Sequence, residues 1–229
     1  MTRRGRVDSV EIVERSDAEP RFPDPFLSLH RLTLRNIHED GAPGPEYPYD
    51  AVLRKWLDAV VLVLVADADG DRCVCLRSCI RPPLLLRETV DLPIPDGREF
   101  HTLWELPAGL IEGGDRGPDG IRRRAAAEAL EEAGYRVEPG SFDLAACAPF
   151  LSPGTIPERI WYATARVDDT ASSVEPEGDG SEVEAGAVVR WIPIDEAVAM
   201  CDRCEILDAK TELGIRRLAD AGSRRESDK

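Results

Sequence analysis

The amino-acid sequence predicts an α/β protein, because stretches typical of buried strands and of helices follow one another along its 229 residues. The clearest strand is the apolar run Leu57–Ala66, LDAVVLVLVA, whose β-branched residues are typical of a strand buried on both faces. The clearest helix lies between Pro118, which fits a first-turn position, and Gly134, which fits the position just past a helix end. A strand at Ala187–Ile194 leads into further helical sequence.

The remaining stretches can be assigned in chain order. Polar, proline-punctuated residues 1–25 are expected to be partly mobile. Further strands are predicted at Phe26–Asn36, Tyr49–Lys55, Arg72–Ile80 and Asp143–Phe150, loops at Gly41–Pro48, Arg87–Gly97 and Asp168–Gly186, and helices at Ile194–Met200 and Lys210–Ala221.

This order of elements predicts three parts of the chain. Residues 1–56 form an N-terminal extension with β-strands, residues 57–221 form one domain, and residues 222–229 form a disordered tail.

The composition indicates a soluble globular chain, with 42% hydrophobic and 32% charged residues. A net charge of −15 argues against nucleic-acid binding, which normally needs a basic face. No apolar run reaches the roughly 18 residues of a membrane span. The first residues, MTRRGRVDSVEIVERSD, contain no apolar stretch of the secretory kind, so we expect a cytoplasmic location.

Six cysteines leave two readings open. Cys73 and Cys75, with Cys201 and Cys204, provide four thiols that could bind zinc. The alternative is a set of free thiols in a reducing compartment, with Cys73 and Cys75 acting as small hydrophobic residues of a strand.

Three carboxylates mark the strongest candidate for chemistry. Glu128, Glu131 and Glu132 share one face of the predicted helix, where they repel one another unless a cation lies against them. Mg²⁺ prefers oxygen ligands and is often held by carboxylates together with substrate phosphates. The alternative is an acidic helix end that faces water.

The surrounding residues resemble a Nudix box, G-x5-E-x7-R-E-U-x-E-E-x-G-U, where U is apolar. Gly109 matches the first glycine, and Glu128, Ala129, Glu131, Glu132, Gly134 and Tyr135 match the second half in order. The preceding WELPAG is similar to the lead-in of the ADP-ribose and nucleoside-diphosphate-sugar pyrophosphatase branch. Asp115 stands at the position of the first Glu and Ala127 at that of the Arg, and eleven residues separate them instead of seven.

The resemblance implies an α/β/α sandwich with a mixed sheet, in which Mg²⁺, with Mn²⁺ as a substitute, assists hydrolysis of ADP-ribose or a related nucleoside diphosphate sugar. The implied metal ligands are the Ala108 carbonyl, Glu128 and Glu132, with Glu131 sharing in metal binding and catalysis. The N-terminal strands of this branch often form a homodimer.

The same resemblance implies residues for the substrate and the base. Arg81, at the end of LRSCIRP, Glu105 of WELPAG, and Pro153 and Glu158 of the SPG…ER segment are implied substrate contacts. Arg81 could instead be a surface arginine, and Pro153 part of an ordinary Pro-Gly turn.

The catalytic base is expected in the loop Asp168–Gly186, with Glu182 favoured over Glu184, although both could be solvated acids.

The altered box positions support two expectations. Arg124 lies four residues before Glu128 on the same helix face and can take over the orienting role that Ala127 cannot perform. If it does not, a rival function is a catalytically weak Nudix domain that binds nucleotide ligands as a sensor.

Overall fold

The computed structural model describes residues 7–17, 26–68, 70–98, 100, 102–176 and 187–227, and only the backbone of 7–17 and 223–227. The chain divides into two compact units. The first comprises Met1–Leu57 with Ser152–Glu158, and the second comprises Asp58–Leu151 with Arg159–Lys229.

The first unit is built on a three-stranded antiparallel sheet. Its strands are β1 (Val7–Asp17), β2 (Ser28–His38) and β3 (Pro43–Leu53), paired in the order β1-β2-β3. The segment 152–158 joins this unit through hydrogen bonds from Val52 N–H to the Thr155 carbonyl, at 2.9 Å, and from the Tyr49 hydroxyl to the Gly154 carbonyl, at 2.8 Å.

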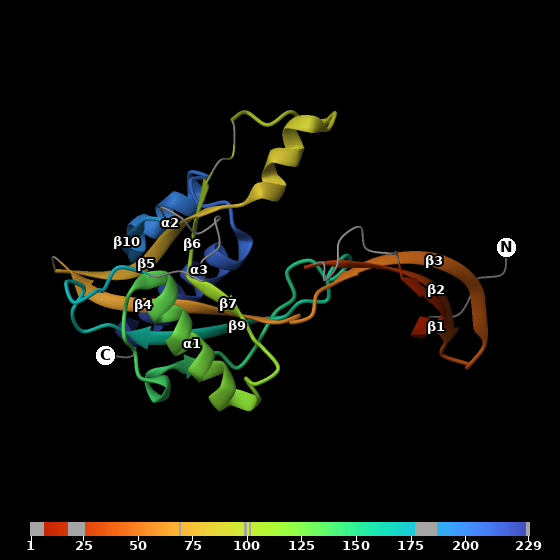
Figure 1. Ribbon diagram of the computed structural model, residues 1–229, viewed down its shortest axis with the longest axis horizontal. Coiled ribbons are helices and arrows are strands. Elements are labelled where there is room, and N and C mark those ends of the chain that lie inside the picture. The colour runs from red at the N-terminus through yellow and green to blue at the C-terminus, as the bar shows by residue number, and fades with distance from the viewer. Residues whose placement is uncertain are drawn as a thin grey trace. The chain divides into compact units, whose positions relative to one another are not determined.

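The second unit contains a mixed sheet with helices (Figure 1). Its main path runs β10-β5-β4-β9-β8, while β6 pairs with β5 and β7 pairs with β4. The pairing of β4 with β9 is parallel, and the other pairings are antiparallel. The strands are β4 (Ala59–Ala68), β5 (Asp71–Ile80), β6 (Thr102–Glu105), β7 (Ala108–Leu110), β8 (Asp143–Leu144), β9 (Ile160–Arg166) and β10 (Val189–Pro193).

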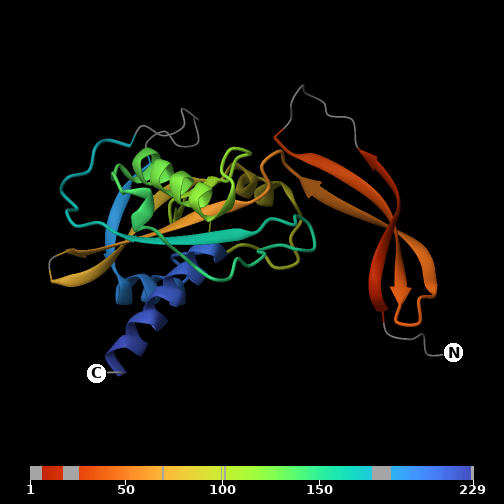
Figure 2. The same cartoon turned by 90° about the horizontal axis from the view of Figure 1, so that it is seen from below.

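Helices cover both faces of this sheet. They are α1 (Gly117–Ala133), α2 (Ile194–Asp202) and α3 (Ala209–Ser227), with short 3₁₀ helices η1 (Pro82–Thr89) and η2 (Pro139–Ser141). Figure 2 shows α1, in green, on one side of the sheet and α3, in dark blue, on the other.

The central strand β4 contributes side chains to a hydrophobic core on each face of the sheet. Val61, Val63 and Val65 pack in the core that contains α2 and α3 residues, whereas Leu62 and Leu64 pack in the core that contains α1 residues. A strand buried on both faces needs a continuous apolar run, as the sequence predicted. The α/β sandwich with a mixed sheet is therefore confirmed.

The ends of α1 follow the local sequence. Pro118 lies in the first turn, where its missing N–H removes no intrahelical hydrogen bond. Gly134 caps the C-terminus with φ of 76°, a left-handed conformation that glycine adopts without strain. Its N–H bonds the Leu130 carbonyl at 3.0 Å.

Several local predictions were wrong. Residues 7–17 form β1, in a stretch of the N-terminal extension where the sequence located no strand, and β3 begins at Pro43, inside the expected loop Gly41–Pro48. Proline was the misleading signal, because β3 is an edge strand, where a missing N–H is tolerated.

Three boundaries also differ from the sequence prediction. β8 covers only Asp143–Leu144 of the expected strand Asp143–Phe150, and η1 enters the expected loop Arg87–Gly97. Helix α3 continues to Ser227, into the expected disordered tail 222–229, where the arginine and glutamate residues favour a helix.

Among the helices that the structure describes, none combines the length and the apolar character needed to cross a membrane.

Candidate active site

The three box glutamates lie on the C-terminal half of α1, facing the sheet to different degrees. Glu128 and Glu132 are buried, at 9% and 8% exposure, and Glu131 is partly exposed. Two buried carboxylates one turn apart are costly unless each has a cation or hydrogen-bond donor beside it. The structure supplies such groups for both.

Glu128 lies directly against Gly109 at the centre of β7. A Cβ built on Gly109 would stand 1.8 Å from Glu128 Oε1 and 2.0 Å from Cδ. A side chain at position 109 would displace this carboxylate, so the glycine allows Glu128 to lie against β7.

Glu132 joins α1 to two strands. Its Oε2 accepts a hydrogen bond from the Ala108 N–H at 2.7 Å, and its Oε1 forms a buried ion pair with the guanidinium of Arg77 on β5. Arg77 is 3% exposed. Strand β7, helix α1 and strand β5 are therefore held together at this carboxylate.

Arg124, which precedes Glu128 by four residues on α1, contacts two acids of the box. Its Nε donates to Asp115 Oδ2 at 2.9 Å, and its Nη1 lies 3.7 Å from Glu128 Oε1. The residues added between Asp115 and Ala127 belong largely to α1, which begins at Gly117. Arg124 lies three residues before Ala127 on this helix and contacts Asp115, the residue at the first acidic position of the box.

A second ionic cluster surrounds Glu105 at the end of β6. Arg81 donates from Nε and Nη2 to the two Glu105 oxygens, both at 2.7 Å, and the Lys210 ammonium also contacts Glu105 Oε2. Lys210 further lies 2.9 Å from Asp208 Oδ2. Glu105 is 1% exposed, whereas the Arg81 side chain is 48% exposed, so one edge of the guanidinium faces outward.

The electrostatics keep this cluster ionised. Burial acts to raise the pKa of Glu105, but the hydrogen bond from Arg81 and the charge of Lys210 outweigh it and lower that pKa below its ordinary value. The hydrogen bond to Glu105 raises the pKa of Arg81. Burial acts to lower the pKa of Lys210, but Glu105 and Asp208 raise it overall.

The other predicted residues fall elsewhere. Pro153 and Glu158 belong to the first unit, where the Glu158 carboxylate forms an ion pair with Arg54. They are not in the unit that contains the glutamates of α1. Glu182 and Glu184 lie outside the described residues.

The donor set around α1 suits a hard divalent cation. Carboxylate oxygens accept several bonds each, so Glu132 can keep its contacts with Arg77 and Ala108 and still offer lone pairs to a metal. Within the described part of the chain, however, no three acidic, histidine or cysteine side chains converge as one metal-binding group. Glu128 is turned toward Arg124 and Glu132 toward Arg77.

The cysteines are all free thiols. Burial raises the pKa of Cys75 and of Cys79 to about 12, as expected of thiols that pack as small hydrophobic side chains.

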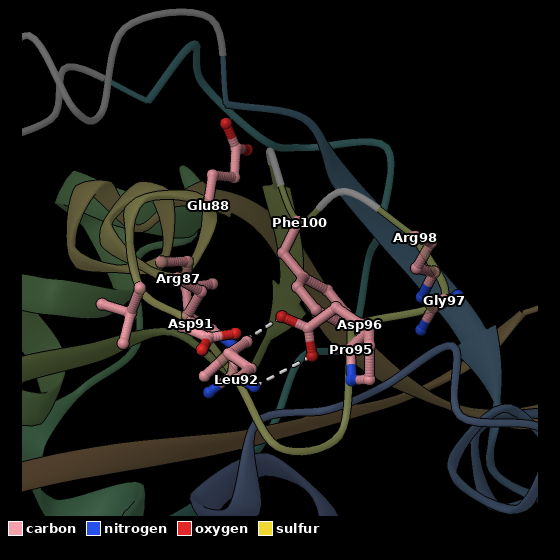
Figure 3. A pocket seen from close by; sticks show the side chains of 11 residues that line it. Arg87, Glu88, Asp91, Leu92, Pro95, Asp96, Gly97, Arg98 and Phe100 are labelled. Atoms are coloured by element: carbon pink, nitrogen blue, oxygen red, sulfur yellow. Dashed lines mark hydrogen bonds and ion pairs between the residues drawn. The ribbon is translucent and has the colours of Figure 1, made fainter.

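A cavity of about 480 Å³ lies in the segment that follows Arg81 (Figure 3). Arg87 and Asp96 form a bidentate ion pair across it, at 2.7 and 2.9 Å, and Leu84 and Phe100 add apolar lining. None of the α1 glutamates lines it. We place the site on the carboxylate face of α1, because the buried charges gather there.

Two residues in these clusters were missed from the sequence. Arg77 interrupts an otherwise apolar stretch of β5, and a charge at a buried strand position was the available signal. Lys210 begins a predicted helix, and its contact with Glu105, 105 residues away, has no local signal.

Comparisons with known proteins identify the family and the fold. The family model described as NUDIX domain matches residues 56–211. The crystal structure of an ADP compounds hydrolase is similar to the chain with a TM-score of 0.61 and 14% identity, covering 95% of this chain and 97% of that chain. At this identity the likeness shows the fold. A search of curated proteins found no match. Because the family match spans more than half of the sequence, the chain belongs to the NUDIX domain family and is, as the sequence predicted, a hydrolase of phosphoanhydride bonds.

Proposed function

We propose that the protein hydrolyses the pyrophosphate bond of ADP-ribose or a related nucleoside diphosphate sugar in a Mg²⁺-dependent reaction. Water adds to one phosphorus and the bridging oxygen leaves with the other, so the products are a nucleoside monophosphate and a sugar phosphate. The similarity to an ADP compounds hydrolase supports this substrate class.

The observation that carries the proposal is the pair of buried carboxylates, Glu128 and Glu132, held against Gly109 and Ala108 of β7. We assign Glu128, Glu132 and the Ala108 carbonyl to the metal, with Glu131 sharing. Bound Mg²⁺ would offset the charge of the diphosphate and lower the pKa of a bound water. A helix turn holds these carboxylates more rigidly than a loop can.

Arg81 is the proposed contact for a substrate phosphate. A guanidinium carries five N–H donors in a planar fork, and Glu105 accepts two of them. The outward edge keeps donors in the geometry that phosphate oxygens accept, which makes arginine well suited to this task. Pro153 and Glu158 remain proposed substrate contacts on the resemblance alone.

The base is proposed to come from Glu182, or from Glu184. Val174 and Val188, which stand before and after these two glutamates in the sequence, form hydrogen bonds with residues that are sequence neighbours of the site residues. Val174 N–H donates to the Gly134 carbonyl at 2.9 Å, two residues from Glu132, and Val188 bonds Ser78, the neighbour of Arg77, in both directions at 2.9 Å. These anchors support a base delivered from residues 175–187.

One observation favours the rival function of a ligand-binding module. The guanidinium of Arg77 already neutralises Glu132, so a metal gains less from this carboxylate than from an unpaired one. Binding of nucleotides without turnover would follow if Arg77 excluded the metal.

A homodimer and a cytoplasmic location complete the proposal. Of the described side chains of β2 and β3, only His30 is fully buried, so this sheet has little core of its own and a second copy could cover it. Sedimentation velocity of the full chain tests the dimer through its mass. The six free thiols suit a reducing compartment.

The test of the substrate class is a panel of ADP-ribose, ADP-glucose, UDP-glucose, GDP-mannose and NADH with Mg²⁺ or Mn²⁺, with products separated by chromatography. The proposal expects AMP from ADP-ribose or from a related sugar nucleotide. Binding of these compounds by calorimetry without any product would support the sensor instead.

A further inference from the structure

The first turn of α3 holds the end of β6 and the residues that lead from it into β7. The Thr211 hydroxyl, fully buried, accepts a hydrogen bond from Leu106 N–H at 2.9 Å. The residues that precede these two are also in contact, because the Lys210 ammonium forms an ion pair with the Glu105 carboxylate. The helix is itself fixed by Asp208, which accepts a hydrogen bond from Thr211 N–H at 2.9 Å. The position of Glu105 therefore depends on α3.

The charges in this region form an alternating chain, Arg81–Glu105–Lys210–Asp208. Glu105 is shared by two cations and Lys210 by two anions, whereas Arg81 stands at the outer end. Without Lys210, the buried charge of Glu105 would be balanced by Arg81 alone. The guanidinium would then lose much of its attraction for another anion, since two opposite charges in contact largely cancel at a distance.

We propose that Lys210 is a positioning residue that acts through Glu105, so that Arg81 presents a fixed and still cationic edge to a phosphate group of the substrate. The identity of that substrate rests on the proposed function. The step that Lys210 serves is binding of the anion.

The distribution of contacts supports a role in binding rather than in the chemical step. The contacts that the structure gives for the Lys210 side chain are Glu105 and Asp208, and the glutamates of α1 are contacted by Arg77 and Arg124. The Lys210 side chain is 14% exposed, which keeps its charge close to Glu105 and poorly screened by water.

The experiment compares Lys210→Met, Lys210→Arg and the matched control Lys55→Met, which removes the same charge from an exposed position of the first unit. For each variant we would measure kcat and KM with ADP-ribose and Mg²⁺, and the Kd of inorganic pyrophosphate by calorimetry. Lys210→Met should raise KM and the pyrophosphate Kd about tenfold, because one partner of a buried charge pair is lost. Its kcat should change less than about twofold.

Lys210→Arg should recover most of the binding, because a guanidinium can contact the same two carboxylates, and Lys55→Met should match the wild type. If Lys210→Met does not fold, Lys210→Gln carries the same comparison. Unchanged KM and Kd, a loss confined to kcat, or a failure of Lys210→Arg to restore binding would each overturn the proposal. Weaker pyrophosphate binding in Lys210→Met, with no wild-type hydrolysis of any sugar nucleotide, would retain the role of Lys210 and reject the proposed substrate.

Discussion

Glu128 Oε1 lies so close to Gly109 that a methyl group on this glycine would come within 1.8 Å of the oxygen. The carboxylate is the movable end of a side chain, so substitution should displace the carboxylate rather than unfold the sheet. Gly109→Ala is therefore expected to lower kcat by about 100-fold, as a misplaced metal ligand would, while the melting temperature changes little.

Gly114→Ala is the matched control for this prediction, because its added Cβ would meet nothing within 4 Å. Near-normal kcat in Gly109→Ala, or an equal loss in both variants, would show that the close approach of Glu128 has no role in turnover.

Arg124 should matter more than its two neighbours in the RRR sequence. It contacts Asp115 and Glu128, whereas Arg122 contacts the Phe142 carbonyl and Asp119 at the helix surface, and Arg123 is exposed. Arg124→Ala should lower kcat/KM about tenfold by releasing Glu128. Steady-state kinetics of the three single alanine variants test this ranking. A larger loss from Arg122→Ala or Arg123→Ala would refute the pairing.

Removal of the catalytic base should lower kcat. Replacing Glu182 and Glu184 together by glutamine is expected to lower kcat by about 100-fold or more and to leave KM nearly unchanged, because proton transfer contributes only in the transition state. The single variants identify which glutamate acts, and exposed Glu175→Gln serves as a control from the same acidic segment. If the double variant keeps a near-normal kcat, the base must be sought among Glu112, Asp115 and Glu158.

The ion pairs of Glu105 should make stability depend on pH in the acid range. Because its pKa is lowered in the folded state, its stabilising contribution is complete above the unfolded value of about 4.3 and is lost as pH falls through the lower folded pKa. At pH 7, Glu105→Gln should be destabilised by roughly 2 to 4 kcal/mol in urea unfolding. The difference in unfolding free energy between Glu105→Gln and the wild type should disappear at pH values below the folded pKa of Glu105.

Glu196→Gln is the control for this measurement, because its ion pair with Arg203 is exposed and should contribute little at any pH. A gap between Glu105→Gln and wild type that stays constant on acidification would contradict the assignment.

Most of the fold could be predicted from patterns among residues that are neighbours in the sequence. The apolar run of β4 predicted a strand buried on both faces, and Pro118 and Gly134 predicted both ends of α1, because backbone conformation and burial are written in neighbouring residues. Prolines misled the reading of β3, since an edge strand and a loop both tolerate a missing N–H.

The parts of the candidate site that the sequence could indicate are those that a motif brings together along the chain. The glutamates of α1, Gly109 and Arg124 fall in one such stretch. The pairing of Glu105 with Lys210, and that of Glu132 with Arg77, join segments 105 and 55 residues apart. Such contacts depend on how helices are laid on the sheet, which no local pattern encodes.

The central claim is that the carboxylate face of α1 uses Mg²⁺ to hydrolyse a nucleoside diphosphate sugar. Its most direct test is AMP release from ADP-ribose as a function of Mg²⁺ concentration, in the wild type and in Glu132→Gln, which keeps the shape of the side chain. We expect that wild-type turnover requires Mg²⁺ and stops with a chelator, and that Glu132→Gln folds but loses metal-dependent turnover. A Glu132→Gln protein that keeps the full rate and the wild-type Mg²⁺ requirement would contradict the claim.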